Sequence, residues 1–224
     1  MMNTKRLAEL IYSVAQYEGY NTSVFQTQKN LLSNKNEWQF LNERDYYIFE
    51  DLLKAIHYAS NQVELTVDFL KEINGQMDSY KEGQPEKPGK LRNKVEIHVG
   101  DYVPPFTVTE EMVRREIDAV KGNSIEDGWE LYARLAKLQA FDNGNKRTAL
   151  ISANLLVGSL RGETQMFLTI PTDFRRMQFD ANLMYFYMAD DWDDYLPDVQ
   201  YSLDKFVRFA KEFTLTNKNI FDVN

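Results

Sequence analysis

The feature that most constrains this chain is a short polar loop, Asp142 to Lys146, held between two apolar helical patterns. The sequence Asn143-Gly144 within the loop favours the left-handed backbone that ends one helix and starts another. We therefore predict helices from Ser124 to Leu138 and from Asn145 to Leu160 that meet at their buried ends. The apolar positions behind this prediction are Leu131, Leu135 and Leu138 before the loop and Ala149, Ala153, Leu156 and Leu160 after it.

The start of the second predicted helix is a candidate anion site. Backbone N–H groups near Gly144, Asn145 and Lys146 have no carbonyl partner within the helix, and the helix dipole is positive at this end. Lys146 and Arg147 add two cationic side chains. A phosphate group suits such an arrangement. An ordinary helix–helix turn has the same composition, so the residues alone leave both interpretations open.

The composition points to an all-α protein, and a length of 224 residues suits one domain or one domain with an appended helical piece. Aromatic residues are plentiful, Gly and Pro are few, and the apolar residues recur mostly with a helical period. The absence of cysteine excludes disulfides and cysteine-ligated metals, and it suits a reducing cytoplasm. A net charge of -8 argues against binding to nucleic acid. We see no signal peptide or long apolar span, and so expect a soluble cytoplasmic protein that does not bind membranes.

The loop resembles the signature of the Fic/death-on-curing family. That signature reads His-x-Phe-x-Asp/Glu-Gly-Asn-Gly/Lys-Arg, and in the death-on-curing branch it ends Asn-Lys-Arg-Thr-Ala-Leu. The chain fits at Phe141 and from Gly144 to Leu150. It departs at two positions, because Gln139 stands in place of the histidine and Asn143 in place of the acidic residue. The resemblance implies a Fic-type helical bundle with a small β-hairpin flap.

The resemblance also implies a site for ATP or another nucleoside triphosphate. Gly144 would let phosphate oxygens approach the backbone, Asn145 would donate to one of them, and Lys146 and Arg147 would contact the phosphates through their charges. Asn143 takes the position of the family's magnesium ligand, where an uncharged amide oxygen is weaker than a carboxylate. We therefore expect Mg²⁺ to bind weakly.

Gln139 is the greater departure, because it takes the position of the catalytic histidine. A glutamine amide does not titrate near neutral pH and cannot accept a proton from a target hydroxyl. General-base catalysis typically contributes about 10²–10⁴-fold in rate. The chain is thus expected to be a weak or inactive relative of the protein adenylyltransferases, which carry out AMPylation.

The resemblance implies a single domain over residues 1–224. It would consist of N-terminal helices at about 1–60, the Fic core at about 61–190 and a C-terminal helix at about 195–224. A first helix is predicted from Thr4 to Tyr17, closing at Gly19, and its end looks like the family's inhibitory helix, written Ser/Thr-x-x-x-Glu-Gly/Asn. Glu18 would be the inhibitory carboxylate. The match is imperfect, because Ser13 is displaced by one position and Leu150 stands where the family has the partner arginine. A solvent-facing role at the helix end fits Glu18 equally well.

Residues 88–105 are predicted to form the flap. Val95, Ile97 and Val99 alternate with polar residues, which is typical of a strand, and flanking prolines and Arg92 match the family's flap arrangement. The resemblance implies that Arg92, Val95, Glu96 and Ile97 bind an extended segment of a target protein by main-chain pairing. From the residues alone, a hairpin that merely covers the bundle is the alternative.

The remaining patterns predict scaffold. Helices are expected at Asn42–Ser60, Thr66–Met77, Thr109–Lys121, Phe174–Met188 and Val199–Phe213, with a loop at Ser79–Pro88. His57 is expected to be a packing or surface residue, and His98 to lie too far from the loop to act as a base. The acidic run Asp190–Asp194 lacks the glycine and terminal glutamate of a calcium loop, so a solvated turn is expected.

Three functions remain open at this level. The favoured one is a Fic-fold protein that binds a nucleotide and a target but transfers AMP weakly or not at all. The second is an active toxin of the death-on-curing type that transfers a phosphoryl or nucleotidyl group, with an antitoxin as a partner. The third is a non-catalytic interaction module in which the loop is only a turn. A homodimer is compatible with each of these functions.

Overall fold

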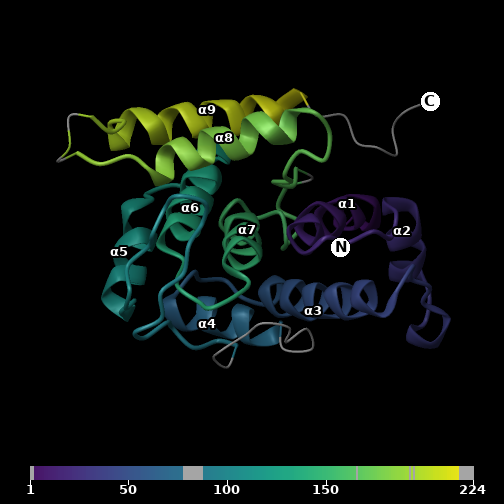
Figure 1. Ribbon diagram of the computed structural model, residues 1–224. Coiled ribbons are helices and arrows are strands. Elements are labelled where there is room, and N and C mark those ends of the chain that lie inside the picture. The colour runs from purple at the N-terminus through teal and green to yellow at the C-terminus, as the bar shows by residue number, and fades with distance from the viewer. Residues whose placement is uncertain (1–2, 78–87, 165, 192, 194, 217–224) are drawn as a thin grey trace.

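Helix α7 (Asn145–Leu156) runs through the middle of the molecule, and the other helices surround it (Figure 1). The computed structural model describes residues 3–77, 88–164, 166–191, 193 and 195–216. In this part of the chain the regular structure is helical, as predicted. The other helices are α1 (Thr4–Ala15), α2 (Val24–Leu32), α3 (Glu43–Ser60), α4 (Val67–Gln76), α5 (Glu110–Ala119), α6 (Ile125–Leu138), α8 (Arg175–Tyr187) and α9 (Val199–Thr216), with short 3₁₀ helices η1 (Gln16–Glu18) and η2 (Lys35–Glu37).

The predicted helix starts are confirmed by their capping side chains. Asn42, Thr66 and Thr109 each precede a helix and accept a hydrogen bond from the backbone N–H three residues later, at 2.8, 3.0 and 3.3 Å. These bonds satisfy N–H groups that have no carbonyl partner within the helix. Ser124 begins α6 with a full capping box, because Asp127 also accepts from the Ser124 N–H.

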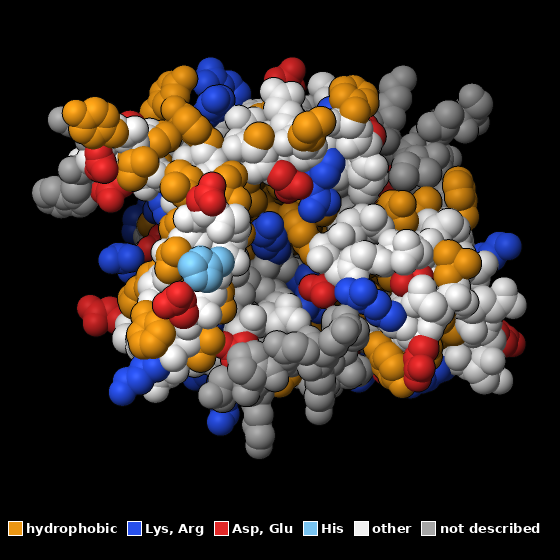
Figure 2. Space-filling view, viewed as in Figure 1, with side chains coloured by type: hydrophobic (Ala, Val, Ile, Leu, Met, Phe, Trp, Pro, Cys, Tyr) orange, Lys and Arg blue, Asp and Glu red, His pale blue; other side chains and the backbone are white. Residues whose placement is uncertain are grey.

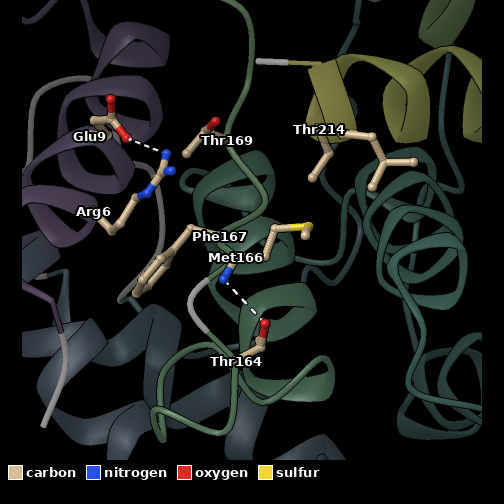
Figure 3. Close-up of a pocket in the computed structure, with 8 residues that line it drawn as sticks. Arg6, Glu9, Thr164, Met166, Phe167, Thr169 and Thr214 are labelled. Carbon is tan, nitrogen blue, oxygen red and sulfur yellow. Dashed lines mark hydrogen bonds and ion pairs between the residues drawn. The ribbon is translucent and has the colours of Figure 1, made fainter. Parts of the chain in front are cut away.

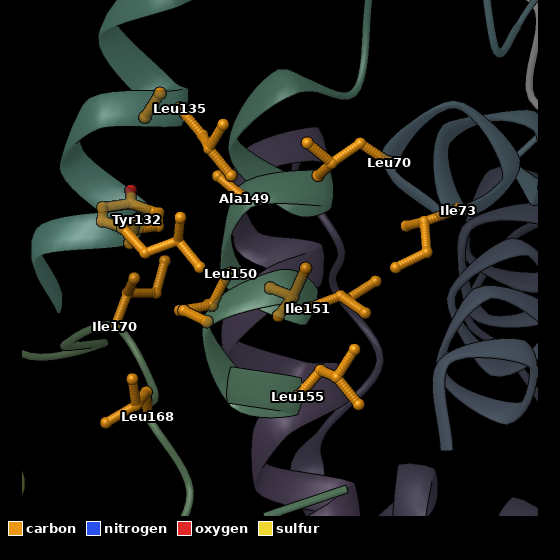
Figure 4. Packing of buried hydrophobic residues seen from close by; sticks show 14 of the residues in the cluster. Leu70, Ile73, Tyr132, Leu135, Ala149, Leu150, Ile151, Leu155, Leu168 and Ile170 are labelled. Carbon is orange, nitrogen blue, oxygen red and sulfur yellow. The ribbon is translucent and has the colours of Figure 1, made fainter. Parts of the chain in front are cut away.

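The core forms where α7 packs against α4 and α6 (Figure 4). Leu150 and Ile151 of α7 are completely buried there, between side chains of the two neighbouring helices. On the other side of α6 an aromatic cluster joins α6 to α8 and α9. Its members are Trp129, Tyr132, Phe179 and Phe206, whose ring centres lie 5.1–6.2 Å apart. Aromatic packing of this kind ties α6, the first helix of the motif, to α8 and α9.

A buried carboxylate fixes the turn between α1 and α2. Asp45 of α3 is fully buried and accepts hydrogen bonds from the Thr22 N–H at 2.7 Å and the Thr22 hydroxyl at 2.6 Å. The Asn21 N–H donates to the same carboxylate at 3.2 Å. Gly19 precedes this turn with a left-handed φ of 71°. The end of α1 and η1 is therefore tied to α3 across the fold.

The predicted β-hairpin is wrong for the described part of the chain. Residues 92–106 form a loop whose two sides are joined by backbone hydrogen bonds such as Val95 N–H to Phe106 O, but its β bridges are limited to one, between Val99 and Tyr102. Two causes are visible. Lys94 has a left-handed φ of 59°, which interrupts the alternation. Pro104 and Pro105 lack the N–H groups that a strand needs to pair.

Other differences concern the ends of elements. The first helix ends at Ala15 and continues as η1, and α7 ends at Leu156 rather than Leu160. The loop predicted at Ser79–Pro88 falls almost entirely outside the described residues. No helix in the described part of the chain combines the length and apolar character that a membrane crossing requires.

Replacing Asp45 with Ala is expected to lower the free energy of unfolding by about 3 kcal/mol, because buried donors of Asn21 and Thr22 lose a charged acceptor. Chemical denaturation followed by circular dichroism measures this change. Glu64, an exposed carboxylate, provides the control, and Glu64→Ala should stay within about 0.5 kcal/mol of the parent. Equal stability of the two variants would contradict the anchoring role of Asp45.

Candidate functional site

The predicted loop lines a hollow of about 230 Å³ at the N-terminus of α7. Residues from three separate parts of the chain meet in it. They are Tyr17 and Glu18 of η1, Val99 of the 92–106 loop, and Gln139 and Asp142–Arg147 of the motif. In the space-filling view the centre of this face is hollowed, and basic and acidic side chains meet there (Figure 2). The fold thus brings together Glu18, Gln139 and Gly144–Arg147, all of which the sequence identified as candidates.

The loop turns sharply at Gly144, which caps α7 in the left-handed conformation with φ of 77°. A Cβ at this position would lie 2.9 Å from Nδ2 of Asn74 and 3.5 Å from Nη2 of Arg147. Glycine is therefore required both for the backbone conformation and for the close approach. The first N–H groups of α7 follow immediately, and an α-helix offers them no carbonyl of its own.

Asn145 holds the loop together. Its Nδ2 donates to the Phe141 carbonyl at 2.6 Å, and its Oδ1 accepts from the Phe141 N–H at 2.8 Å. Both ends of the amide are therefore engaged by the backbone of the loop, and the side chain is almost fully buried. This placement differs from the predicted role as a donor to phosphate and makes Asn145 a structural link between loop and helix.

Asn143, the residue at the family's metal position, is also engaged inside the protein. Its Oδ1 accepts from the Gly144 N–H at 2.7 Å and from Nη2 of Arg147 at 3.1 Å. A magnesium ion would have to displace both donors and lie against a guanidinium. The residues present therefore do not fit Mg²⁺ at Asn143. Within the described residues, no group of three or more His, Cys, Asp or Glu side chains could hold a metal ion.

Glu18 forms an ion pair with Arg147 across the hollow. Oε1 of Glu18 lies 2.9 Å from Nη2 of Arg147, whose side chain is 2% exposed. The family's partner position is held by Leu150, which is buried in the core. The carboxylate instead contacts the arginine of the loop itself, beside the N-terminus of α7. The structure thus places Glu18 inside the site and not at a solvent-facing helix end.

Tyr17 packs beside Glu18 and contacts two further cations. Its ring centre lies 5.1 Å from Nζ of Lys146 and 4.7 Å from Cζ of Arg176 in α8. Its hydroxyl bonds to that of Tyr132, and burial raises the pKa of Tyr17 so that the phenol stays neutral. Burial lowers the pKa of Lys146, an effect that Asp180 partly offsets. The whole η1 segment therefore covers the basic side chains of the loop.

Gln139 ends α6 in a left-handed conformation with φ of 50°. Its Nε2 donates to the carbonyl of Ala136 at 2.6 Å, so the amide is folded back toward its own helix. Its backbone carbonyl accepts from Nε of Arg92, also at 2.6 Å. A side chain held in this way lines the hollow without presenting a titratable group to it.

Arg92 is fully buried and anchors the 92–106 loop. Besides its bond to Gln139, its guanidinium donates to the carbonyls of Val95 at 2.6 Å and Pro105 at 2.8 Å. Its side chain therefore faces the protein interior, where burial lowers its pKa. Glu96 is exposed, whereas Val95 and Ile97 are half-buried, so the predicted flap residues divide into an anchor and an outer segment.

Other candidates lie apart from this hollow. His57 is exposed on α3, and His98 is exposed and pairs with Glu96 at 3.0 Å. Asp190, Asp191 and Asp193 of the acidic run are exposed, whereas positions 192 and 194 fall outside the described residues. A second hollow, of about 280 Å³, lies between α1, the segment around Phe167 and α9 (Figure 3). None of the candidate residues from the sequence lines it.

Comparison with known proteins identifies the central part of the chain. Residues 64–157 match the model of the Fic/DOC family. They contain the loop, the 92–106 segment and helices α4–α7. No curated protein matches the chain in sequence.

Solved structures extend the Fic likeness to most of the chain. A Fic domain containing signaling protein from Bacteroides thetaiotaomicron superposes with a TM-score of 0.66 at 14% identity, covering 93% of this chain and 81% of that one. Fic-1 from C. elegans gives 0.61 at 17% identity, covering 94% and 61%. A Fic family protein from Desulfovibrio desulfuricans gives 0.61 at 14% identity, covering 98% and 67%. At these identities the comparison establishes the Fic fold.

Three residues of this candidate site were not among the candidates from the sequence. Tyr17 and Asp142 line the hollow, and Asn74 of α4 contacts the loop from behind. Asp142 is the variable position of the motif, between Phe141 and Asn143, and its charge could have identified it as a candidate. Asn74 lies 69 residues before its partner Asn143, and its local sequence carries no signal of that contact.

Asn145→Ala is expected to destabilise the protein by about 2 kcal/mol in the absence of any ligand, because two buried backbone groups of Phe141 lose their partners. Thermal and urea unfolding measure the change. Lys146→Met keeps the aliphatic stem and serves as the control, with a smaller expected loss. If Asn145→Ala were as stable as the parent, the linking role would be wrong and a direct ligand contact would again be the better explanation.

Proposed function

We propose that this Fic-fold protein binds ATP or a similar nucleoside triphosphate at the N-terminus of α7, and that Glu18 blocks the site. The observation that carries the proposal is the Glu18–Arg147 ion pair inside the hollow. A carboxylate already occupies the place where cationic side chains and helix N–H groups converge. The same donors suit phosphate oxygens, which carry more charge and can use several donors at once.

The charge of the hollow supports a polyphosphate in particular. Lys146 and Arg147 are adjacent at the start of α7, so they can contact successive phosphates. The volume of about 230 Å³ is below the range of about 300–1,000 Å³ usual for small-molecule sites. Tyr17 and Glu18 account for this small size, because both side chains line the hollow. Withdrawal of η1 would enlarge it.

The proposed target-binding segment is the outer part of the 92–106 loop. Val99 lines the hollow, and Glu96 to His98 precede it on the surface. A target protein bound along this segment would bring a hydroxyl toward the phosphates. Main-chain pairing suits such recognition even without a preformed hairpin, because an incoming strand brings its own donors and acceptors.

AMP transfer by the protein with Gln139 is proposed to be slow or absent. Gln139 bonds to the carbonyl of Ala136 and offers no proton acceptor near neutral pH. Asn143 supplies no open metal ligand. Nucleotide binding does not depend on either residue as a base or as a metal ligand. The protein would therefore act as a nucleotide-dependent binder of its target.

The binding proposal predicts opposite effects from the two members of the ion pair. Isothermal calorimetry with ATP should give about tenfold or tighter binding for Glu18→Gly than for the parent, because the competing carboxylate is gone. Arg147→Met in the Glu18→Gly background should weaken ATP binding at least about tenfold through loss of a charge-assisted contact. Arg161→Met, which removes a cation from the 158–163 turn, should leave the affinity unchanged. Absence of binding in Glu18→Gly would leave an interaction module on a Fic scaffold.

The catalytic proposal predicts a gain of function. The carbonyl of Ala136, which accepts from Gln139 Nε2, is an acceptor near position 139, and a bond to it from Nδ1–H of an imidazole there would leave Nε2 as the base. The Gln139→His, Glu18→Gly double variant should therefore transfer label from α-phosphate-labelled ATP to protein about 10²–10⁴ times faster than Glu18→Gly alone. Gln139→Asn is the control and should stay slow. Equal labelling by Glu18→Gly with and without the Gln139→His change would instead favour an active transferase that uses another base. Transfer of label from γ-phosphate-labelled ATP would then show that the transferred group is a phosphoryl group and not AMP.

A further inference from the structure

Asn74 of α4 is buried behind the motif loop and contacts three different segments. Its Nδ2 donates to the backbone carbonyl of Asn143 at 2.9 Å and to Oγ1 of Thr148 at 3.2 Å. Its Oδ1 accepts from the Gly89 N–H at 2.8 Å. The side chain is 4% exposed. One amide thus links the loop, the first turn of α7 and the segment that leads into the 92–106 loop.

The contact with Asn143 reaches Arg147 through a short chain of bonds. Asn74 holds the Asn143 backbone, and the Asn143 Oδ1 accepts from the Gly144 N–H and from Nη2 of Arg147. The direction of the guanidinium is therefore set by an amide whose backbone is fixed from α4. Arg147 Nη2 also contacts Glu18, so the same atom faces the hollow.

The platform that carries Asn74 is rigid. Gly89 has a left-handed φ of 79°, and a Cβ there would lie 2.8 Å from the carbonyl of Lys71 and 3.2 Å from the Cα of Gly75. The backbone after the undescribed segment therefore lies directly on α4. A Cβ at Gly144 would in turn lie 2.9 Å from the Asn74 amide. The amide has close neighbours on both sides and little freedom to move.

We propose that Asn74 is a positioning residue for nucleotide binding, which orients the Asn143–Gly144 peptide and through it the guanidinium of Arg147. The inference rests on the proposed nucleotide site. It assigns to α4 a part in binding phosphate without direct contact with the ligand. The bond to the Asn143 carbonyl carries this effect, whereas the bond to Thr148 supports the helix end.

The test measures ATP affinity by calorimetry in the Glu18→Gly background, at a temperature where every variant is folded. Asn74→Leu removes the amide at similar size and without adding charge, and we expect ATP to bind at least about tenfold more weakly. Thr148→Val removes one hydrogen-bond partner of Asn74 but keeps the Asn143 contact. Its ATP affinity should therefore stay within about twofold of that of the Glu18→Gly protein. If Asn74→Leu fails to fold, Asn74→Ser takes its place, because its short hydroxyl cannot keep all three contacts.

A control variant at Asn30 distinguishes a loss of positioning from a general loss of stability. Asn30 is buried on α2, where its amide makes paired hydrogen bonds with the backbone of Gln39 at 2.8 and 3.0 Å. Asn30→Leu should lower Tm as Asn74→Leu does, yet keep the parental ATP affinity. Parental affinity in the Asn74 variant, or equal weakening in both variants, would overturn the positioning role while the nucleotide site stands. No ATP binding by Glu18→Gly itself would overturn the nucleotide site and this inference together.

Discussion

Helix α7 is buried along almost its whole length, and this constraint determines the arrangement of the rest of the molecule. A helix in that position must have apolar neighbours on its sides, which α4 and α6 supply, and polar partners at its N-terminus. Arg147 lies in the first turn and is also buried, so its charge needs partners inside the fold. Asn143 and Glu18 provide them. The candidate site is thus the polar end of a helix that is otherwise core.

Three asparagines hold this polar end in place, and each does so through a neutral amide. Asn145 closes the loop on Phe141, Asn143 joins Gly144 to Arg147, and Asn74 joins the loop to α4. Amides can donate and accept at once without adding net charge. The cation of Arg147 is paired with a carboxylate from another part of the chain. That carboxylate is Glu18, which comes from a separate 3₁₀ helix.

The sequence was sufficient for the helices and for the turn that lines the candidate hollow, because both depend on local signals. Capping residues such as Asn42, Thr66 and Thr109 mark helix starts within a few positions, and the turn at Gly144 requires its residue type. The 92–106 loop was predicted wrongly because the alternation of Val95, Ile97 and Val99 was given more weight than Lys94 and the two prolines.

The contacts within the site could not be predicted in the same way. The partner of Glu18 depends on how η1 lies across α7, and the double bond of Asn145 to Phe141 depends on the path of the loop. Asn74 is the extreme case, since its role is created entirely by packing between segments distant in the sequence. Local patterns identify residues that can bond, but tertiary structure decides which of them remain available to a ligand.

Arg92 separates the base of the 92–106 loop from its outer part. Its guanidinium holds the carbonyls of Val95, Pro105 and Gln139, so the path of the base is set by main-chain atoms that every sequence possesses. The exposed residues between these anchors, among them Glu96 and His98, take no part in that arrangement. Substitutions there can accumulate without disturbing the loop's attachment. Proteins with this anchor could therefore diverge in the partners they recognise while the interior of the site stays the same.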